Sequence, residues 1–320
     1  MLSCWVLTDG KAGMESQCLG LAEALGLSPV VKRVVLRPLL RKVTPYLRFG
    51  SFRQFAAESD PLTPPWPDIV IAAGRQSVAP SLWVKRASGG KTRVIQLQNP
   101  GVAWGQFDLI VTPEHDRLSG KNVISTRGSL HRVTPAVLSR SAEKWASLFS
   151  DLPRPYIAVL IGGSNSVYRL GPDEIRKFAA KLSNCARSLN GSLLITPSRR
   201  TGDEMRTALA QTVIGVPNFL WDMAGENPYF GLLGLADFIV VTCDSVNMIS
   251  EAASTGKPVY VEPLPGGSAK SARFLDKLRK SGTVRDFTGT LSRYAYVPMD
   301  DMPNVLSRVR EILPQVPQPQ

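Results

Sequence analysis

The sequence contains few residues of the kinds that build metal sites or disulfide frameworks. Its 320 residues include four cysteines, which lie far apart without a CxxC pair, and two histidines. A disulfide scaffold and a structural zinc site are therefore not expected, and the spacing fits a reducing compartment. The longest apolar runs, such as Phe238–Thr242, are far shorter than the ~20 residues that span a bilayer. The first residues have neither the basic region nor the long apolar region of a signal peptide, so we expect a cytoplasmic protein.

Acidic residues are also scarce relative to basic ones. The chain has 38 Lys and Arg against 26 Asp and Glu, which gives a net charge of +12. Such an excess favours anionic partners, namely nucleic acid, acidic lipid headgroups or phosphorylated small molecules, although a basic surface without a partner fits equally well. Hydrophobic residues make up 43% of the chain, enough to bury sizeable cores and to exclude a disordered or fibrous protein.

One segment, Arg37–Phe55, has no acidic residue and alternates arginine or lysine with leucine, phenylalanine and tyrosine. A basic amphipathic segment of this kind can lie peripherally on an anionic membrane surface. Pro38 and Pro45 exclude one long helix. The alternative is a segment packed on its own lobe with solvated arginines. Nucleic acid is not expected as a partner, because no known binding module is present.

Short apolar runs alternate with helical patterns along the chain, which predicts an α/β fold with parallel strands and crossover helices. The alternation restarts after a proline-rich stretch at 151–155. We therefore expect two Rossmann-like lobes, residues 1–152 and 153–320, facing a cleft. Ligands of open parallel sheets bind beyond the carboxyl ends of the strands, so the loops after the strands are the first candidates for a site. The predicted strands are Cys4–Thr8, Val30–Leu36, Ile69–Ala73, Arg93–Leu97, Leu109–Thr112, Val123–Ser125, Tyr156–Ile161, Ser192–Thr196, Phe238–Thr242 and Pro258–Val261, and the predicted helices are Met14–Leu25, Ser77–Arg86, Pro172–Leu189, Asp203–Gln211, Asp244–Thr255 and Ala269–Lys280.

The loop after the first strand combines glycine with a basic residue. It contains Gly10, Lys11 and Gly13 and leads directly into a helix. Such a turn can present backbone N–H groups and a positive charge to an anion, or it can be a plain tight turn. Its spacing matches neither GxGxxG nor a P-loop, so it supports neither of those cofactor sites.

Two loops of the second lobe have a composition that suits phosphate. Gly162-Gly163-Ser164-Asn165 follows one strand and Ser198-Arg199-Arg200 follows the next. Paired glycines allow a phosphate to approach the backbone, and the guanidinium fork binds oxyanions in a bidentate manner. Alternatively, an arginine here faces only solvent, because adjacent residues rarely point the same way.

The loop after Phe238–Thr242 is the most informative. Asp244 or Ser245 can cap the following helix, which also contains Met248. Glu251 lies two turns further on, among small and apolar residues. A carboxylate in that setting needs a partner, and a ribose diol would supply one. The alternative is a glutamate on a solvated helix face.

Further polar residues are candidates for catalysis or for a base pocket. Glu114 and His115 follow a first-lobe strand, and with Asp9 and Glu15 of the first loop they are the candidate general bases. Asn227 and Tyr229 precede the Phe238 strand and could form a lid, a base pocket or a packed turn. No Ser-His-Asp set can be assigned from spacing alone.

Several of these motifs together resemble the mitochondrial fission "elongated mitochondria" family, over about residues 2–312. The similarity rests on segment 5–17 (WVLTDGKAGMESQ), Ser198-Arg199-Arg200-Thr201, Glu226-Asn227-Pro228-Tyr229 and segment 242–248 (TCDSVNM). The plant member of that family is linked to recruiting a dynamin-related protein to the mitochondrial surface. The resemblance therefore implies an adaptor role at a membrane as one possibility.

The second lobe is also similar, more distantly, to GT-B glycosyltransferases, notably the lipid-linked N-acetylglucosaminyltransferase of peptidoglycan synthesis. Gly162-Gly163-Ser164 and the pattern Glu251…Gly256…Pro258 carry this similarity. It implies that Ser164 and nearby amides contact phosphate and that Glu251 contacts ribose. The DGKAG loop departs from the glycine–histidine loop typical of that transferase, so no catalytic base is implied.

The leading hypothesis is a GT-B-like protein that binds a nucleotide diphosphate sugar as substrate and transfers the sugar without a metal or cofactor. A lipid-linked acceptor near Arg37–Phe55 is one option. The alternative is a non-catalytic adaptor that recruits a partner at a membrane surface. A nucleotide-sugar epimerase is a third and weaker hypothesis, because it would need a GxxGxxG turn after the first strand and a Tyr-xxx-Lys pair, and the sequence has neither. The sequence carries no signal for the oligomeric state.

Overall fold

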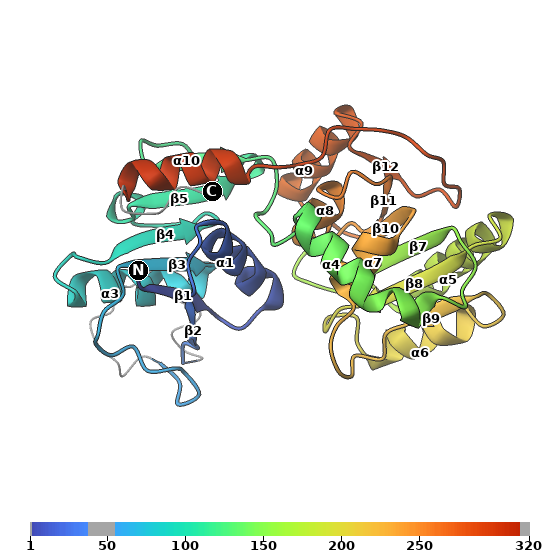
Figure 1. The fold of residues 1–320 in the computed structure, drawn as a ribbon, viewed down its shortest axis with the longest axis horizontal. Coiled ribbons are helices and arrows are strands. Elements are labelled where there is room, and N and C mark those ends of the chain that lie inside the picture. The colour runs from blue at the N-terminus through green and yellow to red at the C-terminus, as the bar shows by residue number, and fades with distance from the viewer. Residues whose placement is uncertain (1, 38–54, 314–320) are drawn as a thin grey trace. The chain divides into compact units, whose positions relative to one another are not determined.

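The computed structural model describes residues 2–37 and 55–313, which divide into two compact units. Unit 1 consists of Met1–Arg132 together with Asp300–Gln320, and unit 2 consists of Val133–Met299 (Figure 1). The chain therefore passes from unit 1 into unit 2 and then returns to complete unit 1.

The predicted boundary at residues 152 and 153 differs from this division. Helix α4 (Pro135–Trp145) belongs to unit 2, because it packs along α7 (Tyr229–Leu235). Helix α10 (Met302–Ile312) belongs to unit 1, because it packs on α1 (Ala12–Ala24) and buries two valines completely. A boundary set by a proline-rich stretch misses both assignments, since each depends on packing between segments far apart in the sequence.

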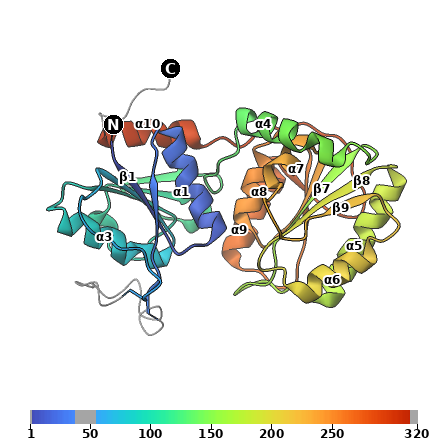
Figure 2. The same ribbon diagram turned by 60° about the horizontal axis from the view of Figure 1, so that its bottom comes forward.

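Unit 1 contains a six-stranded parallel sheet in the order β2-β1-β3-β4-β5-β6. Helices α1 and α10 cover one face and α3 (Val78–Ala87) covers the other, with an apolar cluster on each side (Figure 2). The strand order reverses between β1 and β3. The strands are β1 (Cys4–Thr8), β2 (Val30–Arg33), β3 (Ile69–Ala73), β4 (Arg93–Leu97), β5 (Leu109–Pro113) and β6 (Val123–Thr126), and short 3-10 turns are η2 (Arg75–Ser77), η3 (Trp104–Gln106) and η4 (Glu114–Asp116).

Unit 2 contains a second six-stranded parallel sheet, in the order β12-β11-β10-β7-β8-β9. Helices α5 and α6 lie on one face and α7 and α8 on the other (Figure 2). Its central strands are apolar and fully covered, as expected for parallel strands with helices on both faces. The strands are β7 (Tyr156–Ile161), β8 (Ser192–Pro197), β9 (Asn218–Leu220), β10 (Phe238–Thr242), β11 (Val259–Glu262) and β12 (Val284–Asp286), and the helices besides α4 and α7 are η5 (Ala146–Phe149), α5 (Pro172–Ser188), α6 (Asp203–Thr212), α8 (Val246–Ala253) and α9 (Ala269–Lys280).

The predicted strands and helices are present, most of them within two residues of their expected ends. The strand predicted over Val30–Leu36 ends earlier, at Arg33, and the helix predicted from Asp244 begins at Val246. The sequence analysis missed α4, α7, α10 and the two short edge strands β9 and β12. Both edge strands are three residues long, too short for an alternating pattern to be visible.

Two further predictions concern membranes. None of the helices within residues 2–37 and 55–313 is long and apolar enough to cross a bilayer. The predicted membrane-facing segment lies, apart from Arg37 and Phe55, outside the described residues. Leu36, just before the segment, forms an antiparallel bridge with Phe55 at its end, and Arg37 Nε donates to the Phe55 carbonyl (3.3 Å).

The contact between α4 and α7 depends on two glycines of α7. A methyl group on Gly231 would lie 2.5 Å from Trp145 Cδ1, and one on Gly234 would lie 2.5 Å from the Leu138 carbonyl oxygen. The two helix backbones therefore approach more closely than any side chain at these positions would allow. This packing fixes α7, and with it Tyr229 at the start of α7.

We expect Gly234→Ala to destabilise the protein by about 1–3 kcal/mol, because the new methyl group meets a backbone carbonyl that cannot rotate away. Thermal unfolding of the variant measures the effect. Gly105→Ala is the matched control, since a methyl group there meets nothing within 4 Å. Equal melting temperatures for the two variants would contradict the close helix approach.

Candidate functional site

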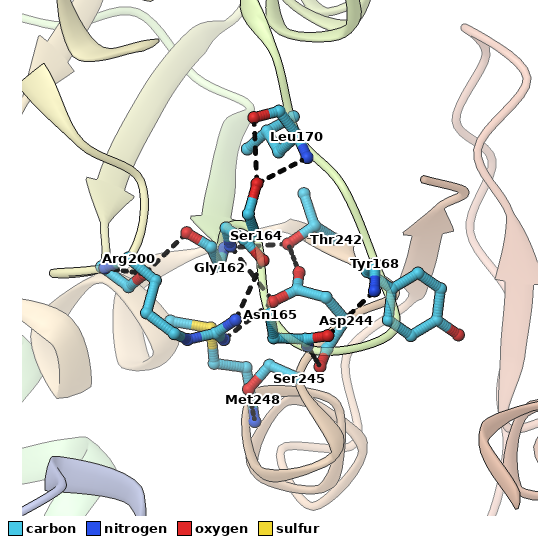
Figure 3. Close-up of polar contacts among 12 residues, drawn as sticks. Gly162, Ser164, Asn165, Tyr168, Leu170, Arg200, Thr242, Asp244, Ser245 and Met248 are labelled. Carbon is cyan, nitrogen blue, oxygen red and sulfur yellow. Dashed lines mark hydrogen bonds and ion pairs between the residues drawn. The ribbon is translucent and has the colours of Figure 1, made fainter. Parts of the chain in front are cut away.

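The carboxyl ends of β7 and β10 lie side by side in unit 2, at the point where the strand order reverses. Loops diverge from such a point to opposite faces of the sheet, and ligands of doubly wound folds bind there. The segment after β7 begins with Gly162-Gly163, and the segment after β10 contains Asp244 (Figure 3). The segment after β8, with Arg200, lies against them (Figure 3). Three of the predicted loops thus meet at one edge.

The Asp244 carboxylate is at the centre of this edge, and its side chain is completely buried. One oxygen, Oδ1, accepts a hydrogen bond from the Thr242 hydroxyl (2.7 Å). The other, Oδ2, accepts from the Gly163 amide (3.1 Å) and pairs with Arg200 Nη2 (2.7 Å). A buried carboxylate requires such partners, because an unpaired one would lose its hydration without compensation.

The two glycines are required by this carboxylate and its partner. A methyl group on Gly162 would lie 2.2 Å from Asp244 Oδ2, and one on Gly163 would lie 2.2 Å from the Arg200 carbonyl oxygen. The Gly162 amide donates to Thr242 Oγ1 (2.8 Å), and the Gly163 amide donates to Asp244. Both amides that we expected at a phosphate donate to acceptors inside the protein.

Ser164 and Asn165 shape the rest of the loop after β7. Ser164 Oγ accepts from the Leu170 amide (2.9 Å) and lies 3.2 Å from the Leu170 carbonyl oxygen. Asn165 Nδ2 donates to the Asp244 carbonyl (3.3 Å), and Asn165 Oδ1 accepts from the amides of Val167 and Tyr168. These side chains hold the loop in one conformation above the β10 turn (Figure 3).

The turn after β8 is fastened to the turn after β7. Ser198 Oγ and Thr201 Oγ1 both donate to the Gly162 carbonyl (2.6 Å each). Arg200 Nη1 donates to the Gly163 carbonyl (2.9 Å), so the guanidinium is held by Gly163 and Asp244 together. Its side chain is still 40% exposed, and Arg199 is exposed as well. Both arginines can therefore reach a ligand on the solvent side of the edge.

Helix α8 begins immediately after Asp244. Ser245 caps it, with Oγ accepting from the Met248 amide (3.3 Å). The helix dipole adds positive potential at this end of α8. An anion beside Arg200 would therefore meet the positive end of α8 as well.

Glu251 lies further along α8 and is only 7% exposed, so it does not lie on a solvated helix face. The Tyr229 hydroxyl donates to Glu251 Oε2 (2.6 Å). Burial and the adjacent carboxylate raise the pKa of Tyr229 well above its ordinary value, which keeps the phenol protonated as a donor. Asn227 Oδ1 accepts from the Tyr229 amide (3.0 Å) at the start of α7. The predicted Asn227 and Tyr229 thus position Glu251 from the neighbouring helix.

We expect Tyr229→Phe to destabilise the protein by about 1.5–3 kcal/mol, because it removes a hydrogen bond to a buried carboxylate. Chemical denaturation of Tyr229→Phe, Glu251→Gln and the double variant measures the coupling between the two side chains. A coupling energy of about 1–2 kcal/mol is expected for residues in direct contact. Additive effects would show that the hydrogen bond does not contribute.

Lys257 links the same helices at the other end of α7. Its Nζ donates to the carbonyls of Leu233 (2.7 Å) and Gly234 (2.5 Å), in the last turn of α7. Burial lowers the pKa of Lys257 from 10.5 to about 8. The last carbonyls of a helix have no hydrogen-bond donor within the helix, so Lys257 caps α7. In the sequence Lys257 lies between α8 and β11.

We expect this lysine to make stability depend on pH. Between about pH 8 and pH 10.5 the unfolded chain binds a proton at Lys257 that the folded chain does not, so the free energy of unfolding rises with pH. Between about pH 7.5 and pH 9.5 the free energy of unfolding of the wild type should therefore rise by about 2 kcal/mol relative to that of Lys257→Met. Denaturation at several pH values tests this. The exposed Lys144→Met is the control and should show no such gain; a pH-independent difference for Lys257→Met would refute the expectation.

In unit 1 the loop after β1 meets the loop after β3, where that sheet reverses its order. Asp9 Oδ2 accepts from Gln76 Nε2 (3.1 Å) and pairs with Lys11, and the Asp9 side chain is 7% exposed. Gly10, at φ +78°, donates its amide to Thr8 Oγ1 (2.8 Å). The structure thus brings Asp9 and Lys11 together with Gln76, which the sequence analysis did not single out.

The other predicted bases of unit 1 lie in different settings. Glu15 Oε1 and Oε2 accept from Arg33 Nη2 and Nε (3.2 Å each). The carbonyl of Gly13, two residues before Glu15 in α1, accepts a hydrogen bond from Gln17 Nε2 (3.1 Å). Glu114 and His115 form η4 after β5, which β3 and β4 separate from β1 in the sheet. Glu114 is exposed and His115 is buried.

The sequence analysis missed Thr242, which donates to Asp244 in unit 2, and Gln76, which donates to Asp9 in unit 1. Thr242 is the one hydroxyl residue in the otherwise apolar strand β10, and that exception is a usable signal. Gln76 follows β3 by three residues, so attention to the strand on each side of the order reversal would have found it.

Comparisons with known proteins give a family and a fold. The family model for mitochondrial fission ELM1 matches residues 12–313. The mitochondrial fission protein ELM1 of Arabidopsis thaliana is 30% identical, over 96% of this chain and 90% of that protein. The solved UDP-GlcNAc 2-epimerase of Methanocaldococcus jannaschii has a TM-score of 0.56 at 11% identity, over 98% of this chain and 99% of that one. The glycosyltransferase SnogD of Streptomyces nogalater has a TM-score of 0.50 at 14% identity, over 99% and 96%. The GT-B-like α/β fold predicted from the sequence is confirmed.

Proposed function

The chain belongs to the mitochondrial fission ELM1 family, and from that premise we propose that it binds a nucleotide diphosphate sugar at the carboxyl edge of unit 2. The observation that carries this proposal is the placement of two complementary groups on one helix. The start of α8 lies beside the Arg200 guanidinium, and the buried Glu251 lies six residues after the Ser245 cap. Six residues of helix span about 9 Å, the length scale of a nucleoside diphosphate.

The diphosphate is proposed to bind Arg200 and Arg199 at the positive end of α8. Helix amides, the dipole and guanidinium groups all favour phosphate oxygens. In this proposal the amides of Gly162 and Gly163 support the turn, because they donate to Thr242 Oγ1 and Asp244 Oδ2. Ser164 and Asn165 act through the shape of their loop.

The ribose is proposed to bind Glu251. A carboxylate accepts hydrogen bonds from two hydroxyl groups, and Tyr229 holds this one in place by donating to Oε2. Nucleotides with a ribose diol are therefore the expected class.

The proposed reaction is transfer of the sugar to an acceptor without a metal, since the positive end of α8 and the two arginines can stabilise the departing diphosphate. The general base is proposed among Asp9, Glu15, Glu114 and His115. Of these, Glu114 is exposed, Asp9 and Glu15 are half-buried and His115 is buried. Glu114 is therefore the first base to test.

Two other functions fit particular observations. The fold similarity to a UDP-GlcNAc 2-epimerase favours epimerisation of the same class of substrate. The family relationship to a plant protein named for mitochondrial fission favours a non-catalytic adaptor, with residues 37–55 as its proposed membrane-facing segment.

We expect a nucleotide diphosphate sugar to raise the melting temperature of the full chain. At a hundredfold excess over Kd, binding stabilises the folded state by about 2.7 kcal/mol, a shift of a few degrees. Thermal shift with UDP-, GDP-, ADP- and TDP-sugars measures it. Glu251→Gln should abolish the shift, whereas Glu226→Gln, an exposed carboxylate of unit 2, should retain it. No shift with any of these nucleotides would refute the proposal.

The fate of a bound nucleotide sugar distinguishes the three functions. NMR of an incubation with UDP-GlcNAc would show free UDP and a transferred or hydrolysed sugar for a transferase. It would show the C2 epimer for an epimerase and unchanged substrate for an adaptor. A transferase whose turnover survives Glu114→Ala would place the base at one of the other three candidates.

A further inference from the structure

The Asp244 carboxylate lies directly behind the arginine that we propose to bind phosphate. Asp244 Oδ2 is 2.7 Å from Arg200 Nη2, and the aspartate side chain is 0% exposed while the arginine side chain is 40% exposed. The arginine therefore presents its remaining N–H groups to solvent on one side and is neutralised by a buried charge on the other. A phosphate that binds Arg200 meets an ion pair rather than a free cation.

From this arrangement we infer that Asp244 determines the charge of the ligand that the site prefers. Resting on the proposed function, the inference is that Asp244 favours a diphosphate esterified at both ends, as in a nucleotide sugar, over free nucleoside di- and triphosphates. Each additional negative charge on the ligand is repelled by Asp244 and finds no additional compensation from Arg200.

The physical basis is the short distance between two anions that share one guanidinium. Anions on opposite edges of this planar group lie roughly 6 Å apart, where charges still interact appreciably near a protein surface. A phosphate ester with a free terminus carries about one more negative charge above pH 6 than one esterified at both ends. The repulsion therefore acts more strongly on UDP than on UDP-GlcNAc, and more strongly still on UTP.

The other charged groups at this edge do not explain a change in ligand preference between the wild type and Asp244→Asn. Arg199 and the positive end of α8 supply fixed positive charge that is the same in the wild type and in Asp244→Asn, so it cancels when the two proteins are compared. Asp244 also holds Thr242 and the Gly163 amide, which is a structural role. A purely structural role would change the affinity for all three ligands in the same proportion, whereas a role in specificity changes their ratio.

The first experiment compares UDP-GlcNAc, UDP and UTP by isothermal titration calorimetry in magnesium-free buffer of low ionic strength. In Asp244→Asn the ratio of UDP affinity to UDP-GlcNAc affinity should rise about tenfold over the wild type, and the UTP ratio should rise further. Asp276→Asn removes an equal charge at an exposed position of α9 and should leave both ratios unchanged. Binding by Asp244→Asn with unchanged ratios would overturn the inference.

The second experiment needs only the wild-type protein, so it tests the preference for the less charged ligand even where Asp244→Asn does not fold. The terminal phosphate of UDP gains a proton near pH 6, while the charge of UDP-GlcNAc stays constant. Lowering the pH from about 7.5 to about 5.5 should therefore strengthen UDP binding several-fold relative to UDP-GlcNAc. A constant ratio would contradict the inference alone. Absence of binding by all three ligands would instead overturn the proposed function, and the inference with it.

Discussion

The carboxylate of Asp244 is the group on which the geometry of the second unit's carboxyl edge depends. It is withdrawn from solvent, and three partners from three different strand ends compensate for its lost hydration. Those partners fix the ends of β7, β8 and β10 relative to one another. Gly162 follows from the same requirement, since a side chain there would overlap the carboxylate, and Gly163 is required by the close backbone carbonyl of Arg200. A single buried charge thus determines which residues can stand in two loops of unit 2.

A second constraint joins the helices that flank this edge. Helix α7 contacts the α8 region at both of its ends, through Tyr229 on Glu251 and through Lys257 on its last carbonyls. On its other side it is held against α4 by glycine contacts. Glu251 is consequently positioned by a rigid arrangement of three helices, which suits a group that has to meet a ligand in one orientation.

Much of the fold was predictable from the sequence. Buried parallel strands are short continuous apolar runs, and the apolar residues of the helices between them recur with the helical period. The missed elements depend on contacts that local patterns do not encode. Helix α7, with its two glycines, has a weak intrinsic tendency to form, and packing on α4 stabilises it. The strands β9 and β12 extend the sheet only because a neighbouring strand is already in place.

The candidate site was predictable in composition but not in connectivity. Gly162, Gly163, Arg200 and Asp244 were all singled out as ligand-binding residues, and the structure brings them together. Sequence spacing could not show that Asp244 would accept a hydrogen bond from the Gly163 amide and pair with Arg200. These residues follow three different strands, and their contacts depend on how those strands are arranged in the sheet. Glu251 was recognised as a buried carboxylate that needs a partner, and the partner present in the structure is Tyr229 from another helix.

The return of the chain to unit 1 has a consequence for how the protein is made. Val305 and Val309 of α10 are fully buried in the apolar cluster that α10 shares with α1, so residues 2–132 lack part of their core until α10 has been synthesised. Unit 2, which is continuous in sequence, can complete its sheet while unit 1 still lacks α10. The portion translated first is therefore finished last, and during that interval its uncovered apolar face is the surface that a chaperone would have to protect.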